Sequence, residues 1–168
     1  MEVEIRKATV SDTEQITELL YKYLGEYETY STKEVGKYLS DTIVADSGGH
    51  IVGCVEVTPF ANIAGINIDN VCELNGVAVD VNYRSRGIAN NMIDLLSREI
   101  REKNILCAAM ADTGRKARLD TALKASNFEL MSIKKNLWPD LGDCGQCAEK
   151  NICNGSCEAH VYIRYKIG

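Results

Sequence analysis

The feature that most constrains this chain is a glycine-bearing turn between an apolar segment and a helical one. Residues 73–79 read as a strand, and helical spacing of apolar side chains begins at Gly87. Arg84 and Arg86 lie in the turn between them. A helix N-terminus carries unpaired N–H groups and partial positive charge, and arginine adds a permanent cation. These features suit phosphate binding, and they fit an ordinary strand–turn–helix connection with two solvated arginines equally well.

The amino-acid sequence of this turn favours one of these two interpretations. Arg84-x-x-Gly87-x-Ala89 resembles the Q/R-x-x-G-x-G/A signature of the GNAT-type N-acetyltransferases, in which loop amides hold the pyrophosphate of acetyl-coenzyme A. It matches neither the dinucleotide fingerprint nor a P-loop, since no G-x-G-x-x-G and no Gly-Lys-Ser/Thr is present in it. The resemblance implies cofactor contacts from the end of the strand, the turn and the helix start: Val77, Ala78, Val79, Arg84, Ser85, Arg86, Gly87, Ile88, Ala89 and Asn90.

The order of periodic segments predicts one α/β domain over residues 1–168. We expect strands at 3–8, 41–45, 51–60, 70–79, 106–111, 127–135 and 159–167, and helices at 12–24, 32–39, 87–103 and 115–126. An α/β layer architecture follows from this alternation. The order of elements also resembles the GNAT fold along nearly the whole chain, which implies a mixed, mostly antiparallel twisted sheet flanked by helices.

Charge and composition restrict the partners. A net charge of −5 argues against nucleic acid as the main partner and suits a cationic acceptor such as an amine. No run of 18 apolar residues is present, so we expect no membrane span. The N-terminus alternates like a strand and does not read as a signal peptide, which predicts a cytoplasmic protein with reduced cysteines. A homodimer is left open.

The resemblance implies transfer of an acetyl group from acetyl-coenzyme A to a primary amine of a small molecule or a peptide, by direct attack in a ternary complex. Such a reaction needs a base for the ammonium proton and an N–H donor for the oxyanion. The resemblance places the base at Glu73 and the donor at the amide of Val77. The alternative for Glu73 is that it has no catalytic role and is a charged residue at the solvent-exposed end of a strand. Gly76 predicts a bulge or a close backbone approach, and in the family a bulge admits the pantetheine arm.

One departure from the family concerns the general acid. Many members carry a tyrosine five residues before the Phe of a Gly-Phe pair, and this chain has Leu123 there, before Asn127-Phe128. A coenzyme A thiol of moderate pKa can leave as the thiolate, so catalysis remains open. The alternative function is a non-catalytic acyl-coenzyme A sensor, metal sensor or interaction module on the same fold.

The second departure is a cysteine-rich insertion at residues 137–158, between the last two strands. Its four thiols follow a C-x2-C-x5-C-x3-C spacing and can close on one tetrahedral ion: Cys144, Cys147, Cys153 and Cys157. Four soft ligands favour Zn²⁺, with an iron–sulfur cluster, disulfides or free thiols as alternatives. We expect the ion to order a segment that shapes the acceptor site, with Trp138 and Asp140 at its root.

Three further cysteines lie within apolar strands: Cys54, Cys72 and Cys107. Cysteine is among the most often buried residue types, so we expect inert core residues. The alternative is a covalent acyl-cysteine at Cys107, which is close to the expected thioester position.

Overall fold

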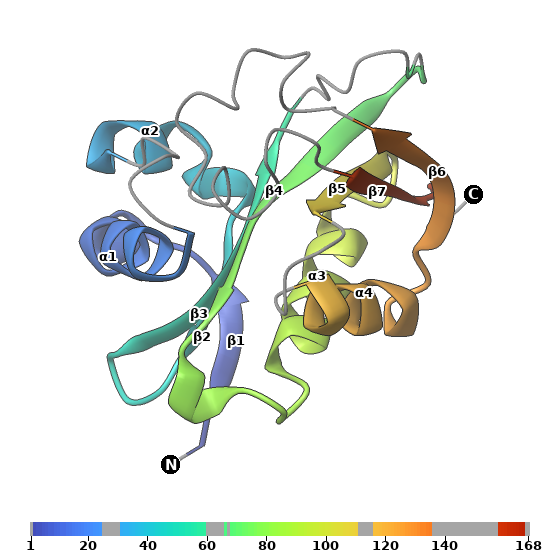
Figure 1. Cartoon of the computed structure of the whole chain (residues 1–168). Coiled ribbons are helices and arrows are strands. Elements are labelled where there is room, and N and C mark those ends of the chain that lie inside the picture. The colour runs from blue at the N-terminus through green and yellow to red at the C-terminus, as the bar shows by residue number, and fades with distance from the viewer. Residues whose placement is uncertain are drawn as a thin grey trace. The chain divides into compact units, whose positions relative to one another are not determined.

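The computed structural model describes residues 2–24, 31–59, 66, 68–110, 116–135 and 158–166. The elements in these ranges confirm the expected order (Figure 1). They are β1 (Glu4–Lys7), α1 (Thr13–Leu24), α2 (Thr32–Lys37), β2 (Ile43–Asp46), β3 (Ile51–Thr58), β4 (Val71–Val79), α3 (Ile88–Glu99), β5 (Asn104–Met110), α4 (Lys116–Ala125), β6 (Glu129–Lys135) and β7 (Glu158–Arg164). The described helices include none long and apolar enough to cross a membrane.

The strands are hydrogen-bonded in the order β1-β2-β3-β4-β5-β7-β6. The β1–β2, β2–β3, β5–β7 and β6–β7 pairs are antiparallel, and β4–β5 is parallel. The expected mixed, mostly antiparallel sheet is therefore confirmed. The chain forms two compact units, and the division falls within β4: the first unit is Met1–Thr58 with Leu74–Arg101, and the second is Pro59–Glu73 with Glu102–Gly168.

The first unit is a three-layer arrangement with helices on both faces of its strands (Figure 1). On one face Cys54 and Ala78 join a core cluster with Ile16 and Leu20 of α1. On the other face the backbone of β3 approaches α3 closely, and a Cβ at Gly53 would lie 3.0 Å from the terminal methyl of Met92. Burial on both faces explains why all eight residues of β3 are buried and why its sequence is almost continuously apolar.

In the second unit β5 is a central strand. Its residues from Ile105 to Met110 pair with β7, and Asn104 to Leu106 pair with the first three residues of β4, Val71 to Glu73. A cluster of Leu106, Ala159, Val161 and Ile163 forms the core beside these strands. The continuous apolar run from residue 106 predicts a buried central strand. Leu106 and Cys107 are buried as predicted, and the strand begins two residues earlier, at Asn104.

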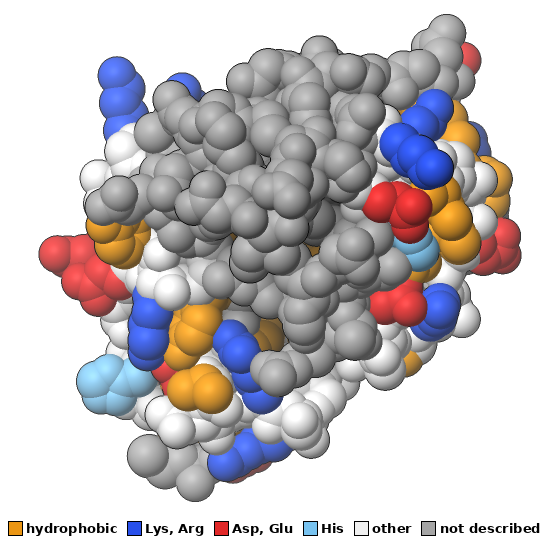
Figure 2. Space-filling model, in the orientation of Figure 1, with side chains coloured by type: hydrophobic (Ala, Val, Ile, Leu, Met, Phe, Trp, Pro, Cys, Tyr) orange, Lys and Arg blue, Asp and Glu red, His pale blue; other side chains and the backbone are white. Residues whose placement is uncertain are grey.

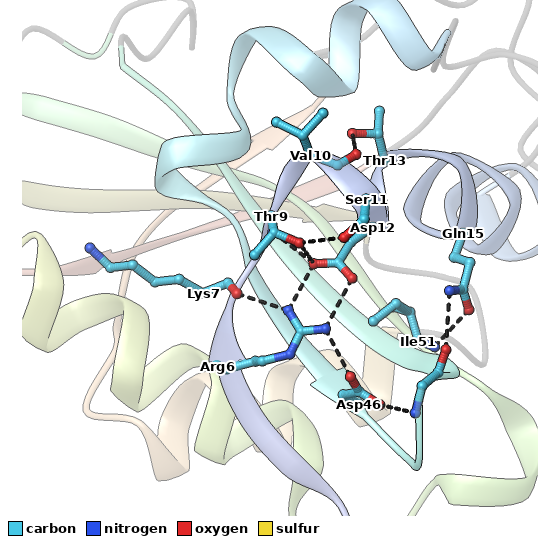
Figure 3. Close-up of polar contacts among 11 residues, drawn as sticks. Arg6, Lys7, Thr9, Val10, Ser11, Asp12, Thr13, Gln15, Asp46 and Ile51 are labelled. Atoms are coloured by element: carbon cyan, nitrogen blue, oxygen red, sulfur yellow. Dashed lines mark hydrogen bonds and ion pairs between the residues drawn. The ribbon is translucent and has the colours of Figure 1, made fainter.

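An ion-pair network fixes the entry to α1 (Figure 3). Arg6 of β1 donates to both carboxylate oxygens of Asp12, at 2.7 and 2.9 Å, and to Asp46 of β2 at 2.8 Å. Asp12 also accepts from the amide of Thr9 at 2.7 Å, which closes a capping box on the short 3-10 helix Val10–Asp12. The guanidinium lowers the pKa of Asp12 to about 2. One arginine thus joins β1, β2 and the start of α1.

Two details of the helices differ from expectation. The helix predicted to reach Lys103 ends at Glu99, because the chain must turn to begin β5 at Asn104, whose amide donates to the carbonyl of Asn70 at 2.9 Å. Apolar spacing predicts that this helix buries Ile88, Met92, Leu95, Leu96 and Ile100. In the structure Ile93 and Ser97 are buried as well, whereas Leu95 and Ile100 are half-buried. A helix packed on a sheet buries a wider face than a minimal apolar stripe, which explains the extra positions.

Candidate functional site

The turn between β4 and α3 is held by Asp80. Its amide donates to the carbonyl of Val52 on β3 at 2.8 Å, which keeps the end of β4 in the sheet. Its side chain accepts from the amide of Asn82 at 3.0 Å and caps the short 3-10 helix Val81–Tyr83. The chain therefore leaves the strand at a defined residue and turns at once toward α3.

Two residues of the turn adopt left-handed backbone angles. Ser85 has φ 63° and Gly87 has φ 74°, and Gly87 is the N-cap of α3. A Cβ at Gly87 would have no heavy atom within 4 Å, so the glycine is required by its backbone angle and the space beside it is open. Gly87 offers no side chain to cap the first turn of α3. Backbone amides arranged in this way form a concavity suited to an anion.

Basic side chains surround the turn. The Nε of Arg84 donates to the carbonyl of Val79 at 2.9 Å, and its guanidinium lies 4.8 Å from the ring centre of Tyr23. Arg86 donates to the carbonyl of Asn82 at 2.9 Å. Figure 2 shows Lys and Arg side chains gathered over the segment between the end of β4 and α3. Backbone carbonyls therefore orient both arginines, of which Arg84 is half-buried and Arg86 is exposed.

The predicted cofactor residues are consecutive parts of one segment in the first unit. Val77, Ala78 and Val79 end β4, and Arg84 to Arg86 form the turn. Gly87 precedes α3, and residues 88–90 form the first turn of that helix. The structure thus brings these residues together as the strand–turn–helix pattern predicts.

Along β4 burial alternates without a change of phase through Gly76. Alternation gives Glu73 and Val77 the same face of the strand, and both are half-buried. A Cβ at Gly76 would lie 3.2 Å from Leu20 and 3.5 Å from the carboxylate of Glu56. Of the two explanations offered for this glycine, the close approach is confirmed by these distances.

Glu56 is a candidate that sequence reasoning missed. It lies in the middle of β3, is 3 % exposed, and its carboxylate faces Gly76 on the α1 side of the strands. The available signal was a single charged residue within the apolar segment IVGCVEVT. Burial of a carboxylate is costly and is frequent at functional sites, so this position belongs with the candidate site.

The three strand cysteines are buried, as expected. Burial, and secondly the charge of Glu73, raises the pKa of Cys107 to about 12. Burial also raises the pKa of Cys54. A thiol must ionise to act as a nucleophile, so the acyl-cysteine alternative at Cys107 is disfavoured.

The departure at the family's tyrosine position also has a structural context. Leu123 is fully buried in α4 and provides no proton donor. Asn127, in place of the family's glycine, has φ 61°, and Asn is one of the few residues that adopt this conformation readily. The amide of Phe128 donates to the carbonyl of Leu123 at 2.9 Å, which ends the helix. Asn127-Phe128 therefore ends α4 with a left-handed residue.

The cysteine-rich insertion lies outside the described residues, as do Cys144, Cys147, Cys153, Cys157, Trp138 and Asp140. Within the described ranges no group of three or more His, Cys, Asp or Glu side chains could hold a metal ion. The metal assignment therefore stays a prediction.

Comparisons with known proteins agree with this fold. Residues 4–111 match the acetyltransferase (GNAT) domain family. No curated protein sequence matches significantly. Among solved structures, the chain is similar to a ribosomal-protein-alanine N-acetyltransferase from Brucella melitensis, with 20% identity, TM-score 0.72 and coverage of 96% of this chain and 99% of that one. It is also similar to Ard1 from Thermoplasma volcanium, with 17% identity, TM-score 0.70 and full coverage of both chains.

A third similar structure is the NatC complex bound to Gag peptide and CoA, with 15% identity, TM-score 0.72 and full coverage of both chains. At these identities the structures establish a shared fold. The family match covers more than half of the chain and includes β4, the turn from Asp80 to Gly87 and α3. The protein is an acyltransferase that belongs to the GNAT acetyltransferase family.

Proposed function

We propose that this protein transfers an acetyl group from acetyl-coenzyme A to a primary amine. The observation that carries the proposal is the turn from Asp80 to Gly87, where left-handed residues, a helix N-terminus and two arginines meet within a GNAT domain. The diphosphate would bind the amides of this turn and the first turn of α3. The pantetheine arm would extend along Val77 to Val79.

In the proposed reaction Glu73 accepts a proton from the acceptor ammonium. The neutral amine attacks the thioester carbonyl, and the amide of Val77 donates to the oxyanion. The C–N bond forms and the C–S bond breaks, the attacking nitrogen releases its second proton to solvent, and coenzyme A leaves as a thiolate that takes a proton from water. Water serves as the acid because Leu123 occupies the position of the family's usual donor. The products are an acetylated amine and coenzyme A.

The acceptor side of the proposal is supported by charge. A net charge of −5 and the carboxylate of Glu56 beside Gly76 suit a cationic amine. One similar structure is named as a ribosomal-protein-alanine acetyltransferase and another contains a peptide. These names suggest a peptide with a free N-terminal alanine as the first probe. A peptide with an internal lysine and a small polyamine represent the other classes of primary amine.

The proposal is tested by titration calorimetry with acetyl-coenzyme A, followed by thiol release with each amine. We expect binding by the wild-type protein and acetylation of at least one probe. Glu73→Gln should bind acetyl-coenzyme A normally and lose the rise of turnover with pH. Turnover of this variant that equals wild type across the pH range would remove Glu73 from the mechanism. Folded wild-type protein that takes up no acetyl-coenzyme A would overturn the whole proposal.

A second candidate function is acyl-coenzyme A binding without transfer. It is favoured by the buried Leu123, since the usual proton donor is replaced by an apolar side chain. The same experiments separate the two functions, because a sensor binds acetyl-coenzyme A and releases no thiol in excess of the uncatalysed rate.

For the cysteine-rich insertion we retain the proposal of a structural Zn²⁺ held by Cys144, Cys147, Cys153 and Cys157. Metal analysis of purified protein should find about one zinc per chain, and Cys144→Ser should lose it. Absorbance near about 400 nm would instead indicate an iron–sulfur cluster. If chelation leaves both folding and acceptor preference unchanged, the insertion has no metal-dependent role.

A further inference from the structure

One tyrosine of α1 connects that helix to the turn from Asp80 to Gly87, which we call the phosphate turn after its proposed function. The ring of Tyr23 packs against the core cluster of the first unit, which fixes its position. Its hydroxyl donates to Oδ2 of Asp80 at 2.8 Å and accepts from the amide of Val81 at 3.0 Å. A single phenol group therefore holds one side chain and one backbone amide at the start of the turn.

Asp80 collects the polar contacts of this region. Besides the Tyr23 hydroxyl, its carboxylate accepts from the amide of Asn82 and from the ammonium of Lys22, each at 3.0 Å. These donors, the Asn82 amide foremost, lower the pKa of Asp80 to about 2. The carboxylate therefore stays ionised near neutral pH. Its charge is compensated by a cation on α1, which reduces its repulsion of a nearby phosphate.

The same ring supports Arg84, the first residue of the phosphate-binding signature. The guanidinium lies 4.8 Å from the ring centre of Tyr23 while its Nε bonds the carbonyl of Val79. A cation over a tyrosine face is attracted by the ring. Tyr23 thus contacts the turn at Asp80, Val81 and Arg84, and these three positions lie before the left-handed Ser85 and Gly87.

We propose that Tyr23 is a positioning residue that holds the turn from Asp80 to Gly87 in its coenzyme-binding conformation before the coenzyme arrives. This inference rests on the proposed function of the turn. When a loop becomes ordered only on binding, the free energy needed to order it weakens the affinity for the ligand. A preformed loop avoids this cost. The hydroxyl group makes the hydrogen bonds to Asp80 and Val81, whereas the ring makes the packing contacts and supports Arg84. We assign the positioning role to the hydroxyl group.

Tyr23→Phe isolates the hydroxyl because it retains the ring. We expect the dissociation constant for coenzyme A, measured by calorimetry, to rise about tenfold, which is the order expected for loss of a hydrogen bond to a charged group. The KM for acetyl-coenzyme A should rise by a similar factor while kcat stays near wild type. The matched control is Tyr21→Phe, which removes the hydroxyl of a half-exposed tyrosine two residues away on α1.

The outcomes separate the inference from the function on which it rests. Wild-type protein that does not bind coenzyme A overturns the proposed function. Equal affinity of wild type and Tyr23→Phe, or an equal loss in Tyr21→Phe, overturns the positioning role and leaves the function intact. A fall in kcat with unchanged KM also contradicts the inference.

A second measurement requires no substitution. Hydrogen exchange should show that the Val81 amide is protected in the coenzyme-free protein and changes little when coenzyme A is added. Fast exchange that slows only on addition of coenzyme A would show that the turn is ordered by its ligand, and would overturn the inference.

Discussion

Replacing Gly87 by alanine is the most direct test of the diphosphate site proposed at the turn from Asp80 to Gly87. Gly87 has φ 74°, and a Cβ there would have no heavy atom within 4 Å. The substitution therefore introduces backbone strain without a steric clash inside the protein. An L-residue in the left-handed region costs about 1–2 kcal/mol, and part of this is offset because alanine restricts the unfolded chain. We expect a net loss of about 1 kcal/mol in the free energy of unfolding, or about 2–4 °C in Tm.

The effect on coenzyme binding should be larger than this strain. The new methyl group occupies the open space beside the N-cap of α3, where a phosphate would approach the amides. Loss of one hydrogen bond to a charged group corresponds to about 1.5–3 kcal/mol, or roughly a ten- to hundredfold rise in the dissociation constant. Calorimetry with coenzyme A and thermal unfolding should be carried out on the same preparations.

Gly49→Ala is the matched control. Gly49 has φ 89° in the hairpin turn between β2 and β3, and a Cβ there would also have no heavy atom within 4 Å. Both variants should lose similar stability because the strain is of the same kind. Only Gly87→Ala should lose affinity for coenzyme A. Unchanged affinity in Gly87→Ala, or an equal loss in both variants, would refute the assignment of the turn as the diphosphate site.

Three further predictions follow from other contacts. Asp12→Asn should lower the free energy of unfolding at pH 7 by about 2 kcal/mol, because Arg6 lowers the pKa of this carboxyl, whose side chain is 7% exposed, from 3.8 to about 2. A carboxyl with a lowered pKa stabilises the folded protein above pH 4, where it is ionised in both states. Urea unfolding should therefore show that the difference in free energy of unfolding between wild type and Asp12→Asn shrinks between pH 4 and 2, and a constant difference would contradict the linkage. Glu56→Gln should raise the KM for a cationic amine about tenfold at unchanged affinity for acetyl-coenzyme A, and an unchanged KM would remove Glu56 from the acceptor site. Cys107→Ser should keep its turnover in thiol-release assays, since the buried thiol with a pKa of about 12 is not a nucleophile, and loss of turnover in a folded variant would revive the acyl-cysteine.

The strand–turn–helix geometry around Gly87 was predictable because its physics is local. The left-handed angle at Gly87, the start of α3 and the two arginines depend on residues close together in the chain. The same holds for the hairpin at Gly48 and Gly49, both of which have positive φ. Periods of two and of 3.6 residues likewise predicted the type and order of the elements, because they record which face of each element is buried.

Element boundaries and burial were predicted less well where they depend on packing against residues far away in the chain. The end of α3 at Glu99 depends on where β5 pairs with β4, and the burial of Ile93 depends on the width of the face that α3 packs on the strands. The close approach at Gly76 depends on Leu20 of α1, far away in the chain. The sequence alone left a bulge and a close approach equally open there.

The amino-acid sequence by itself determined the family and the position of the turn between β4 and α3, since both depend on short-range patterns of glycine, charge and apolar spacing. Only the tertiary structure revealed that Tyr23 holds Asp80, 57 residues along the chain, and that Glu56 faces Gly76. The physical reason is that such contacts require strand register and helix packing to bring remote residues together. No local pattern encodes the distance between two side chains on different elements.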